Sequence, residues 1–161
     1  MDQPAFLSVI QQHQGILHKL CRLYRDSPED REDLFQEMIY QLWKSFPSYA
    51  GNAKISTWIY RIALNTALAG FRKRRISITY TDALPDIPAP ENTGTQQQYQ
   101  LFAALRQLSD AEKAIIALYL DDFSYQEIAG IIGIAENYVG VKINRIKTKL
   151  KNILNASSWT L

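Results

Sequence analysis

Three prolines within six residues, Pro85, Pro88 and Pro90, interrupt this 161-residue chain near its middle. Proline lacks a backbone N–H and blocks a helix interior, so no helix is expected to continue through them. Gly94 and the polar run that follows it prolong the same unpatterned stretch. We therefore predict a flexible linker over residues 76–100, between one small domain at 1–75 and another at 101–155.

Before the linker, residues 27–46 predict an amphipathic helix. Ser27 is a good N-cap, Pro28 suits the first turn, and acidic residues follow near the positive end of the helix dipole. Apolar residues then recur at three- and four-residue steps until Pro47: Leu34, Phe35, Met38, Ile39, Leu42, Trp43 and Phe46. The opposite face carries an acidic stripe of Asp33, Gln36, Glu37 and Tyr40. Such a stripe suits a basic partner surface, and ordinary solvent exposure explains it equally well.

A second helix is predicted from Ile55 to Arg75. One side is apolar, whereas Arg61, Asn65 and Arg72 recur on another and could donate to phosphates and bases. Three nearby aromatic residues could stack on unpaired bases or belong to the core: Tyr49, Trp58 and Tyr60.

After the linker, two capping boxes mark helix starts at Ser109 and Ser124, each with a glutamate three residues later. A short helix at 125–132, a turn at Gly133 and a longer helix at 136–154 have the spacing of a helix-turn-helix. In such a motif the start of the second helix faces base edges, and later basic residues lie toward the DNA backbone. The base-facing residues would be Glu136, Asn137 and Tyr138, and the basic ones Lys142, Arg145, Lys147 and Lys149.

The net charge of +2 conceals a pattern along the chain. Residues 1–75 hold 11 basic and 7 acidic side chains, net +4; residues 76–100 hold only three acids, net −3; residues 101–161 hold 7 basic and 6 acidic, net +1. Basic runs at 72–75 and 142–151 each close an apolar-periodic segment. Two such runs favour nucleic-acid binding over simple solvation.

Several classes of protein are excluded. A single cysteine, Cys21, rules out a disulfide framework and a cysteine-based zinc site, and two histidines supply no second ligand cluster. We expect Cys21 to be a small buried hydrophobe, and we predict no metal or cofactor. No segment approaches eighteen uninterrupted apolar residues and the N-terminus resembles no signal peptide, so we expect a cytoplasmic protein without membrane insertion.

The arrangement resembles the alternative sigma factors of the extracytoplasmic-function group, which consist of sigma region two and region four. Residues 33–37 (DLFQE) are similar to the core-binding motif of region two, and residues 55–67 (ISTWIYRIALNTA) to its segment for promoter melting and minus-ten reading. Residues 108–120 and 125–150 resemble region four, which reads the minus-thirty-five element. The resemblance implies an all-α fold of two small helical domains and a non-enzymatic factor that gives RNA polymerase its promoter specificity.

The resemblance also implies partners and sites. The partners are core RNA polymerase, through the clamp helices of β′ and the flap of β, promoter DNA and an anti-sigma factor. The linker would occupy the nucleic-acid channel of the polymerase. Residues implied to bind polymerase are Asp33, Gln36, Glu37 and Tyr40. Those implied to bind minus-ten DNA are Lys54, Trp58, Tyr60, Arg61, Asn65, Arg72, Arg74 and Arg75, and those for minus-thirty-five DNA are Glu136, Asn137, Tyr138, Lys142, Arg145 and Lys147.

Two positions depart from the family pattern. Ala135 stands where a serine often caps the recognition helix, and Gly140 where a basic residue is common, which points to a different base preference or a close approach of backbone to DNA.

A stand-alone helix-turn-helix regulator is the main alternative, but it leaves the motifs at 33–37 and 58–65 unexplained. A nuclease or recombinase is a third alternative, but this chain has no histidines or cysteines at the spacing of metal ligands. A helical scaffold without a DNA role would leave the basic runs unexplained.

Overall fold

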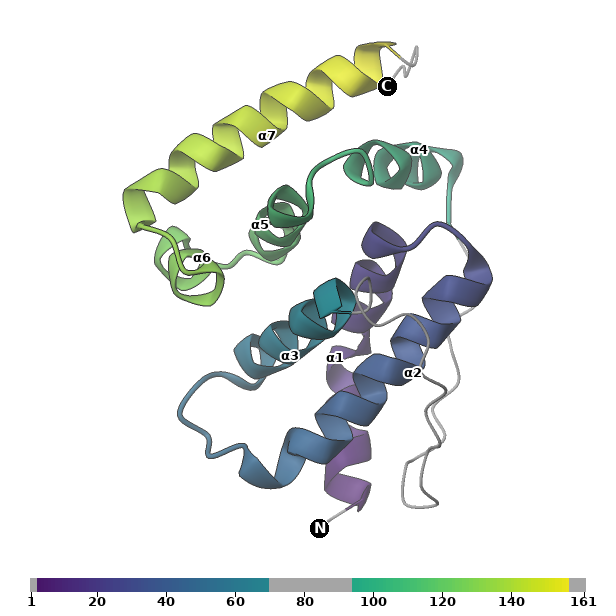
Figure 1. Cartoon of the computed structure of the whole chain (residues 1–161), viewed down its shortest axis with the longest axis vertical. Helices are drawn as coiled ribbons and strands as arrows, with labels where there is room; N and C mark the ends of the chain where they lie inside the picture. Colours follow the sequence, from purple (N-terminus) through teal and green to yellow (C-terminus); the bar gives the residue numbers. More distant parts are fainter. Residues whose placement is uncertain (1–2, 70–93, 157–161) are drawn as a thin grey trace. The chain divides into compact units, whose positions relative to one another are not determined.

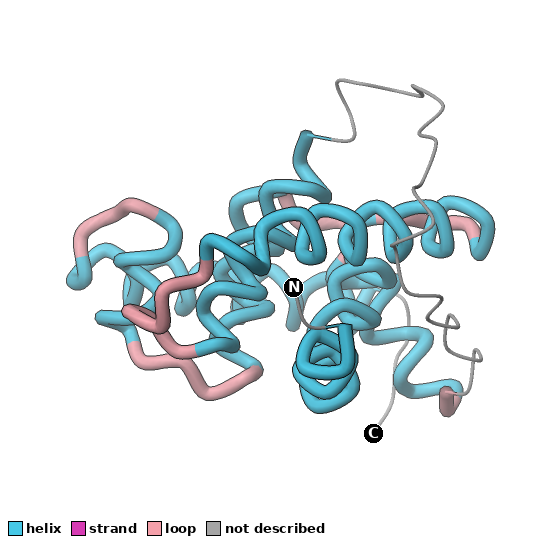
Figure 2. Tube along the Cα trace, turned by 90° about the horizontal axis from the view of Figure 1, so that it is seen from below, coloured by secondary structure: helices cyan, strands magenta, loops and turns pink. Residues whose placement is uncertain are grey.

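The computed structural model describes residues 3–69 and 94–156, which belong to two compact units, 1–91 and 92–161. Within these described residues all regular structure is helical, in agreement with the predicted all-α class (Figures 1 and 2). The predicted basic residues Arg72, Arg74 and Arg75 and the linker up to residue 93 lie outside the described part of the chain.

The first unit contains α1 (Gln3–Tyr24), α2 (Pro28–Ser45), the 3-10 turn η1 (Phe46–Ser48) and α3 (Ile55–Ala69). Helix α2 begins as predicted: the Ser27 side chain accepts a hydrogen bond from the Asp30 amide at 3.1 Å, and Pro28 occupies the first turn. It ends just before Pro47, which lies in η1. The three α-helices pack pairwise against one another, so each contributes to one core.

Aliphatic side chains fill the centre of that core and aromatic rings close one end. Leu17 and Leu20 of α1, Met38 and Leu42 of α2, and Ile59 of α3 are fully buried. The ring of Phe6 meets those of Trp43 and Phe46 edge-on, with centroids 5.0 and 5.4 Å apart, and Trp58 of α3 lies 6.1 Å from Phe46. Edge-to-face pairs of this kind favour one arrangement of the rings. The cluster therefore fixes the start of α3 against α1 and α2.

Cys21 is buried in the first unit, as predicted. Its thiol points to the Met38 sulfur at 3.9 Å. Burial raises the pKa of the Cys21 thiol to about 12, and the positive charges of Arg25 and Arg31 only partly oppose that rise. The thiol is therefore a structural group rather than a reactive one.

The second unit contains α4 (Gln96–Leu105), α5 (Asp110–Leu120), α6 (Tyr125–Ile132) and α7 (Glu136–Ala156). Helix α7 packs against the other three, and its inward residues Val139, Ile143 and Ile146 are fully buried. The capping boxes predicted at Ser109 and Ser124 are both present. A third, of Thr95 and Gln98, starts α4, so residues 96–100 are helical and differ from the linker predicted there.

Gly133 makes the turn between α6 and α7. Its φ of 86° lies in the left-handed region, which glycine adopts without steric cost. The Gly133 and Ile134 amides both donate to the Ala129 carbonyl, at 2.8 and 3.2 Å, and so close the end of α6. The predicted helix-turn-helix is thereby confirmed as a local structure.

Candidate functional site

The acidic stripe predicted on the first unit forms one side of α2. Asp33 is exposed, and Gln36, Glu37 and Tyr40 are half-buried. The Gln41 amide donates to Glu37 Oε2 at 3.0 Å, and the Lys44 ammonium lies 5.6 Å from the centroid of the Tyr40 ring. The opposite side of α2 is core. The stripe is thus a polar surface whose side chains are oriented by neighbours on the same helix.

Arg61 and Asn65 lie exposed on α3, four residues apart and therefore on one face. Lys54 is exposed just before the helix, and its carbonyl accepts the Trp58 amide at 3.1 Å. These residues place a guanidinium, an amide and an ammonium along one edge of the unit. Such donors can bind phosphate and base edges without any catalytic group.

Trp58 is half-buried at the same end of α3. Its ring centroid is 5.1 Å from that of Tyr49, whose hydroxyl donates to the Ala53 carbonyl. The Tyr49 contact therefore holds both the turn before α3 and one side of the indole. Two partly exposed rings at this edge could stack on an unpaired base.

The position of Tyr60 differs from that expected of a DNA-binding residue. Its side chain is fully buried, with the Lys19 ammonium of α1 5.3 Å from the ring centroid. The physical reason is the width of the buried side of α3, which packs against both α1 and α2 and includes Ile59, Tyr60 and Ala63. In this unit the Tyr60 ring has no exposed face for a base.

In the second unit the predicted base-facing residues are all exposed. Glu136, Asn137 and Tyr138 form the first turn of α7, the second helix of the helix-turn-helix. Ala135, just before it, has no side-chain oxygen to cap the helix, and its carbonyl accepts the Tyr138 amide at 3.0 Å. Farther along, Arg145 is exposed and Lys142 half-buried, with the Lys142 ammonium 5.3 Å from the centroid of the Tyr138 ring.

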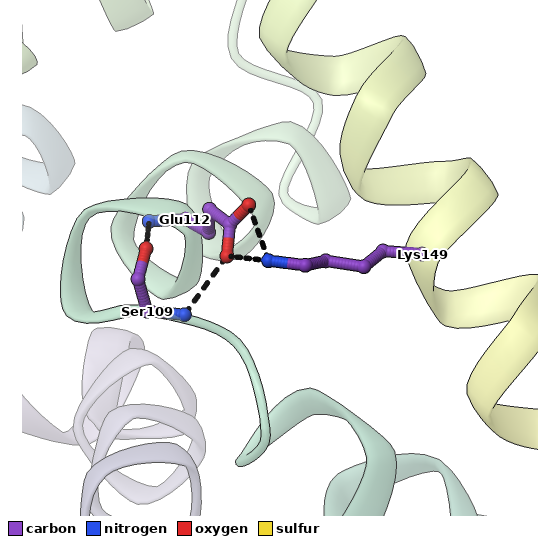
Figure 3. Close-up of polar contacts among 3 residues, drawn as sticks. All are labelled: Ser109, Glu112 and Lys149. Carbon is purple, nitrogen blue, oxygen red and sulfur yellow. Dashed lines mark hydrogen bonds and ion pairs between the residues drawn. The ribbon is translucent and has the colours of Figure 1, made fainter.

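Lys147 and Lys149 differ from the other basic residues of α7 because both contact α5. The Lys147 ammonium donates to the Tyr119 hydroxyl at 2.8 Å and lies 4.7 Å from the ring centroid, and this hydrogen bond raises the pKa of Lys147. The Lys149 ammonium donates to both carboxylate oxygens of Glu112, at 2.9 and 3.1 Å (Figure 3). Part of the predicted basic run is therefore used within the unit.

Glu112 joins the start of α5 to α7. Its Oε1 also accepts the Ser109 amide at 2.9 Å, while the Ser109 hydroxyl accepts the Glu112 amide (Figure 3). Partial burial would raise the pKa of this carboxyl, but the hydrogen bonds from Ser109 and Lys149 outweigh burial and lower the pKa. One carboxylate thus completes a capping box and an interhelical ion pair.

Gly140 has a structural explanation that the sequence did not supply. A Cβ atom at this position would lie 3.2 Å from Cε2 of Tyr125, the first residue of α6. The aromatic ring therefore occupies the space of the missing side chain. The Tyr125 ring thus limits the space for a side chain at Gly140. Sequence reasoning missed this residue pair because the two positions are fifteen residues apart.

In the described part of the chain, no group of three histidine, cysteine or acidic side chains is placed to hold a metal ion. Over the same residues, no helix is long and apolar enough to cross a membrane.

Comparisons with known proteins agree on one family. The Sigma-70 region 2 model matches residues 9–76, and the Sigma-70 region 4 model matches residues 98–150. Among similar proteins, ECF RNA polymerase sigma factor SigG of Mycobacterium tuberculosis is 29% identical over 83% of this chain, which spans 44% of that protein's length. SigW of Bacillus subtilis is 25% identical, with 95% of this chain and 90% of SigW covered.

Solved structures show the same fold. The sigma factor RpoE of Bartonella quintana, solved with the anti-sigma factor NepR, superimposes with a TM-score of 0.69 at 21% identity, covering 95% of this chain and 96% of that one. CnrH, solved with the cytosolic domain of CnrY, gives a TM-score of 0.68 at 20% identity, with 96% and 90% covered.

Proposed function

The chain belongs to the sigma-70 family, in its extracytoplasmic-function group, and we propose that it binds core RNA polymerase and directs transcription initiation from specific promoters. The observation that carries the proposal is the presence of both regions in one chain and in this order, each forming its own helical unit. A stand-alone regulator needs only the second unit and would leave the region 2 match unexplained. The comparisons therefore do not favour that alternative.

In the proposed function the acidic stripe of α2 docks on the clamp helices of the β′ subunit. Asp33 and Glu37 supply negative charge, and Gln36 and Tyr40 supply polar contacts between them. Charge complementarity at such a surface speeds association and fixes the register of the two partners. The hydrogen bond from Gln41 supports this role because it orients the Glu37 carboxylate before any partner arrives.

The exposed edge of α3 binds the separated non-template strand at the minus-ten element. A base taken out of the duplex loses its stacking neighbours, and an aromatic surface with nearby donors replaces them. Trp58 provides the surface, while Lys54, Arg61 and Asn65 provide donors. We also assign phosphate binding to Arg72, Arg74 and Arg75, from their sequence alone. Tyr60 is retained as a core residue that positions α3.

The helix-turn-helix of the second unit binds the minus-thirty-five element, with α7 in the major groove. Its first turn presents Glu136, Asn137 and Tyr138 to base edges, and Lys142 and Arg145 lie farther along toward phosphates. Lys147 has a smaller part, since its ammonium is hydrogen-bonded to Tyr119. The chain contributes recognition, and the polymerase contributes the chemistry of RNA synthesis.

Two further partners follow from the family. The flap of the β subunit would hold the second unit at the upstream element, and an anti-sigma factor would cover the same surfaces that polymerase uses. The structural neighbour RpoE supports an anti-sigma partner, since it was solved with the anti-sigma factor NepR. A factor of this kind works in the cytoplasm, where core polymerase is found.

Run-off transcription tests the proposal. Core polymerase is supplied with and without this chain on promoters from its own genome, and we expect transcripts that depend on the chain. Absence of such transcripts, with active core polymerase on a control template, would show the proposal to be wrong. Specific binding to duplex DNA without polymerase, together with no effect on transcription, would favour the stand-alone regulator.

A further inference from the structure

Helix α7 exposes an apolar side chain, Val141, on the second helix of the helix-turn-helix. Val141 is 43% exposed, one turn after the start of the helix, and Tyr138 beside it is 41% exposed. A β-branched aliphatic residue on an otherwise polar helix surface gains nothing from water. On the second helix of a helix-turn-helix, such a side chain is available to contact a base edge.

The helix geometry places Val141 directly opposite the core. Val139, Ile143 and Ile146 are fully buried and define the inward side. At about 100° per residue, Val141 lies about 200° around the helix from Val139. Asn137 is only about 40° from Val141 around the axis, and Asn144 about 60°. The exposed Arg145, one turn after Val141, is also about 40° from it. The most outward face of α7 consequently carries two amides, one aliphatic side chain and the Arg145 guanidinium.

The neighbours of Val141 are held in place. On one side the residue before it, Gly140, has no side chain, and the Tyr125 ring of α6 lies against the space where a Cβ would be. On the other side the Lys142 ammonium lies 5.3 Å from the centroid of the Tyr138 ring, which draws the positive charge toward that ring. On the side toward the start of α7, Val141 therefore lies next to aromatic rings, and Arg145 lies one turn beyond it.

This surface matches one feature of duplex DNA. In the major groove, thymine is the base that presents a methyl group, and apolar side chains contact it, whereas asparagine pairs with the edge of adenine. We propose that Val141 is a specificity-determining residue that contacts the C5-methyl group of a thymine in the minus-thirty-five element. The inference depends on the proposed function, in which α7 enters the major groove.

The experiment compares thymine with uracil, which lacks only the C5-methyl group. The preferred upstream element is first selected from randomised promoters with the complete polymerase complex. Each thymine in it is then replaced by uracil, and promoter affinity of the complex is measured. At one position we expect affinity to fall about fourfold with the original chain, the change that loss of one buried methyl-sized group produces.

Two variants complete the design. Val141→Ala should bind the thymine and uracil promoters equally at that position, because its side chain no longer reaches the methyl group. Asn152→Ala, an exposed change near the other end of α7, should keep the fourfold difference. Thermal unfolding of both variants by circular dichroism checks that each is folded, which the exposure of both side chains favours.

The outcomes separate the two claims. Normal transcription with equal affinity for thymine and uracil at every position would overturn the role of Val141 and leave the proposed function standing. A uracil effect that persists unchanged in Val141→Ala would also overturn it. Absence of any transcript that depends on the chain would overturn the proposed function, and the inference with it.

Discussion

The Lys149 ammonium and the Glu112 carboxylate form an ion pair of 2.9 Å that ties the second half of α7 to the first turn of α5. The same Glu112 oxygen accepts the Ser109 amide, so a local cap and a contact between distant helices share one atom. A change at Glu112 consequently removes two kinds of stabilisation, which suitable variants can separate.

Glu112→Gln should retain the cap, since its amide oxygen can still accept the Ser109 amide, but lose the ion pair. Glu112→Ala should lose both and lower the free energy of unfolding by about 1 kcal/mol. Urea unfolding of the whole chain, followed by circular dichroism, measures both. Lys149→Ala is the matched control for the ion pair, and equal stability of Glu112→Ala and the original chain would contradict the prediction.

The same carboxyl predicts a dependence on pH. Its pKa is lower in the folded chain than its ordinary value of 4.5, so folding favours the ionised form. Its contribution is therefore complete above pH 4.5 and is lost as the pH falls through the lower folded-state pKa. The stability difference between the original chain and Glu112→Gln should shrink on acidification over that range. A difference that grows toward acid pH would show the assigned direction to be wrong.

Gly140→Ala should stabilise the second unit, although Tyr125 limits the gain. Alanine is favoured over glycine in a helix interior by about 1 kcal/mol, but its Cβ would press on the Tyr125 ring at 3.2 Å. Tyr125 is partly exposed, so its ring can shift by a few tenths of an ångström. A double-mutant cycle with Tyr125→Ala should give a larger gain in that background. Identical gains in both backgrounds would mean that the two residues do not interact.

Glu37→Lys should weaken binding to core polymerase by about tenfold or more, since a like charge would face the basic partner surface that we propose. Glu32→Lys is the control: it is an equal charge change on exposed α2 surface, about 140° around the helix from Glu37. Affinity can be measured by fluorescence anisotropy of the labelled chain. Equal losses for both variants would indicate a general charge effect rather than docking through the stripe.

Arg145→Ala should weaken all promoters alike, because in the proposed function its guanidinium binds a phosphate and reads no base. The slope of log affinity against log salt should fall by about 0.9, the value for one phosphate that the chain no longer neutralises. Lys147→Ala should reduce the slope less, because its ammonium is hydrogen-bonded to the Tyr119 hydroxyl. The measurement is a potassium chloride series with the complete polymerase complex. Equal reductions would imply that Lys147 leaves Tyr119 when DNA binds.

Cys21 should resist thiol reagents in the folded chain. With a pKa of about 12, its thiolate is scarce at pH 8, and native modification should be at least about a thousandfold slower than in urea. Absorbance after addition of an aromatic disulfide reagent reports the rate. Rapid reaction without denaturant would show that the thiol is accessible and that the first unit opens easily.

The elements that the sequence predicted well have signals within a few residues. Ser27 with Pro28, and the capping boxes at Ser109 and Ser124, fix helix starts through bonds between near neighbours. The same local signal stands at Thr95, where Gln98 completes a capping box. Helix α1 also has a periodic signal in the sequence, since Phe6, Ile10, Leu17 and Cys21 recur at helical spacing on its buried side.

The features that sequence reasoning missed depend on contacts between helices. Tyr60 could be placed only once it was known that α3 packs on two helices, which makes its buried side wide. Lys147 contacts Tyr119, which lies 28 residues earlier in the sequence. The Tyr125 ring lies against Gly140, which follows it by fifteen residues. Val141 gave no signal by itself, since an apolar residue in an apolar-periodic helix is expected to be buried. Only the register of α7 on its core identifies it as exposed.

The three capping boxes of the second unit also bear on how fast it folds. Helix formation is limited by its first turn, and a reciprocal pair of side-chain bonds within four residues stabilises that turn before any tertiary contact forms. Helical domains dominated by local contacts fold in about microseconds to milliseconds. The second unit should accordingly regain its structure rapidly after transient unfolding.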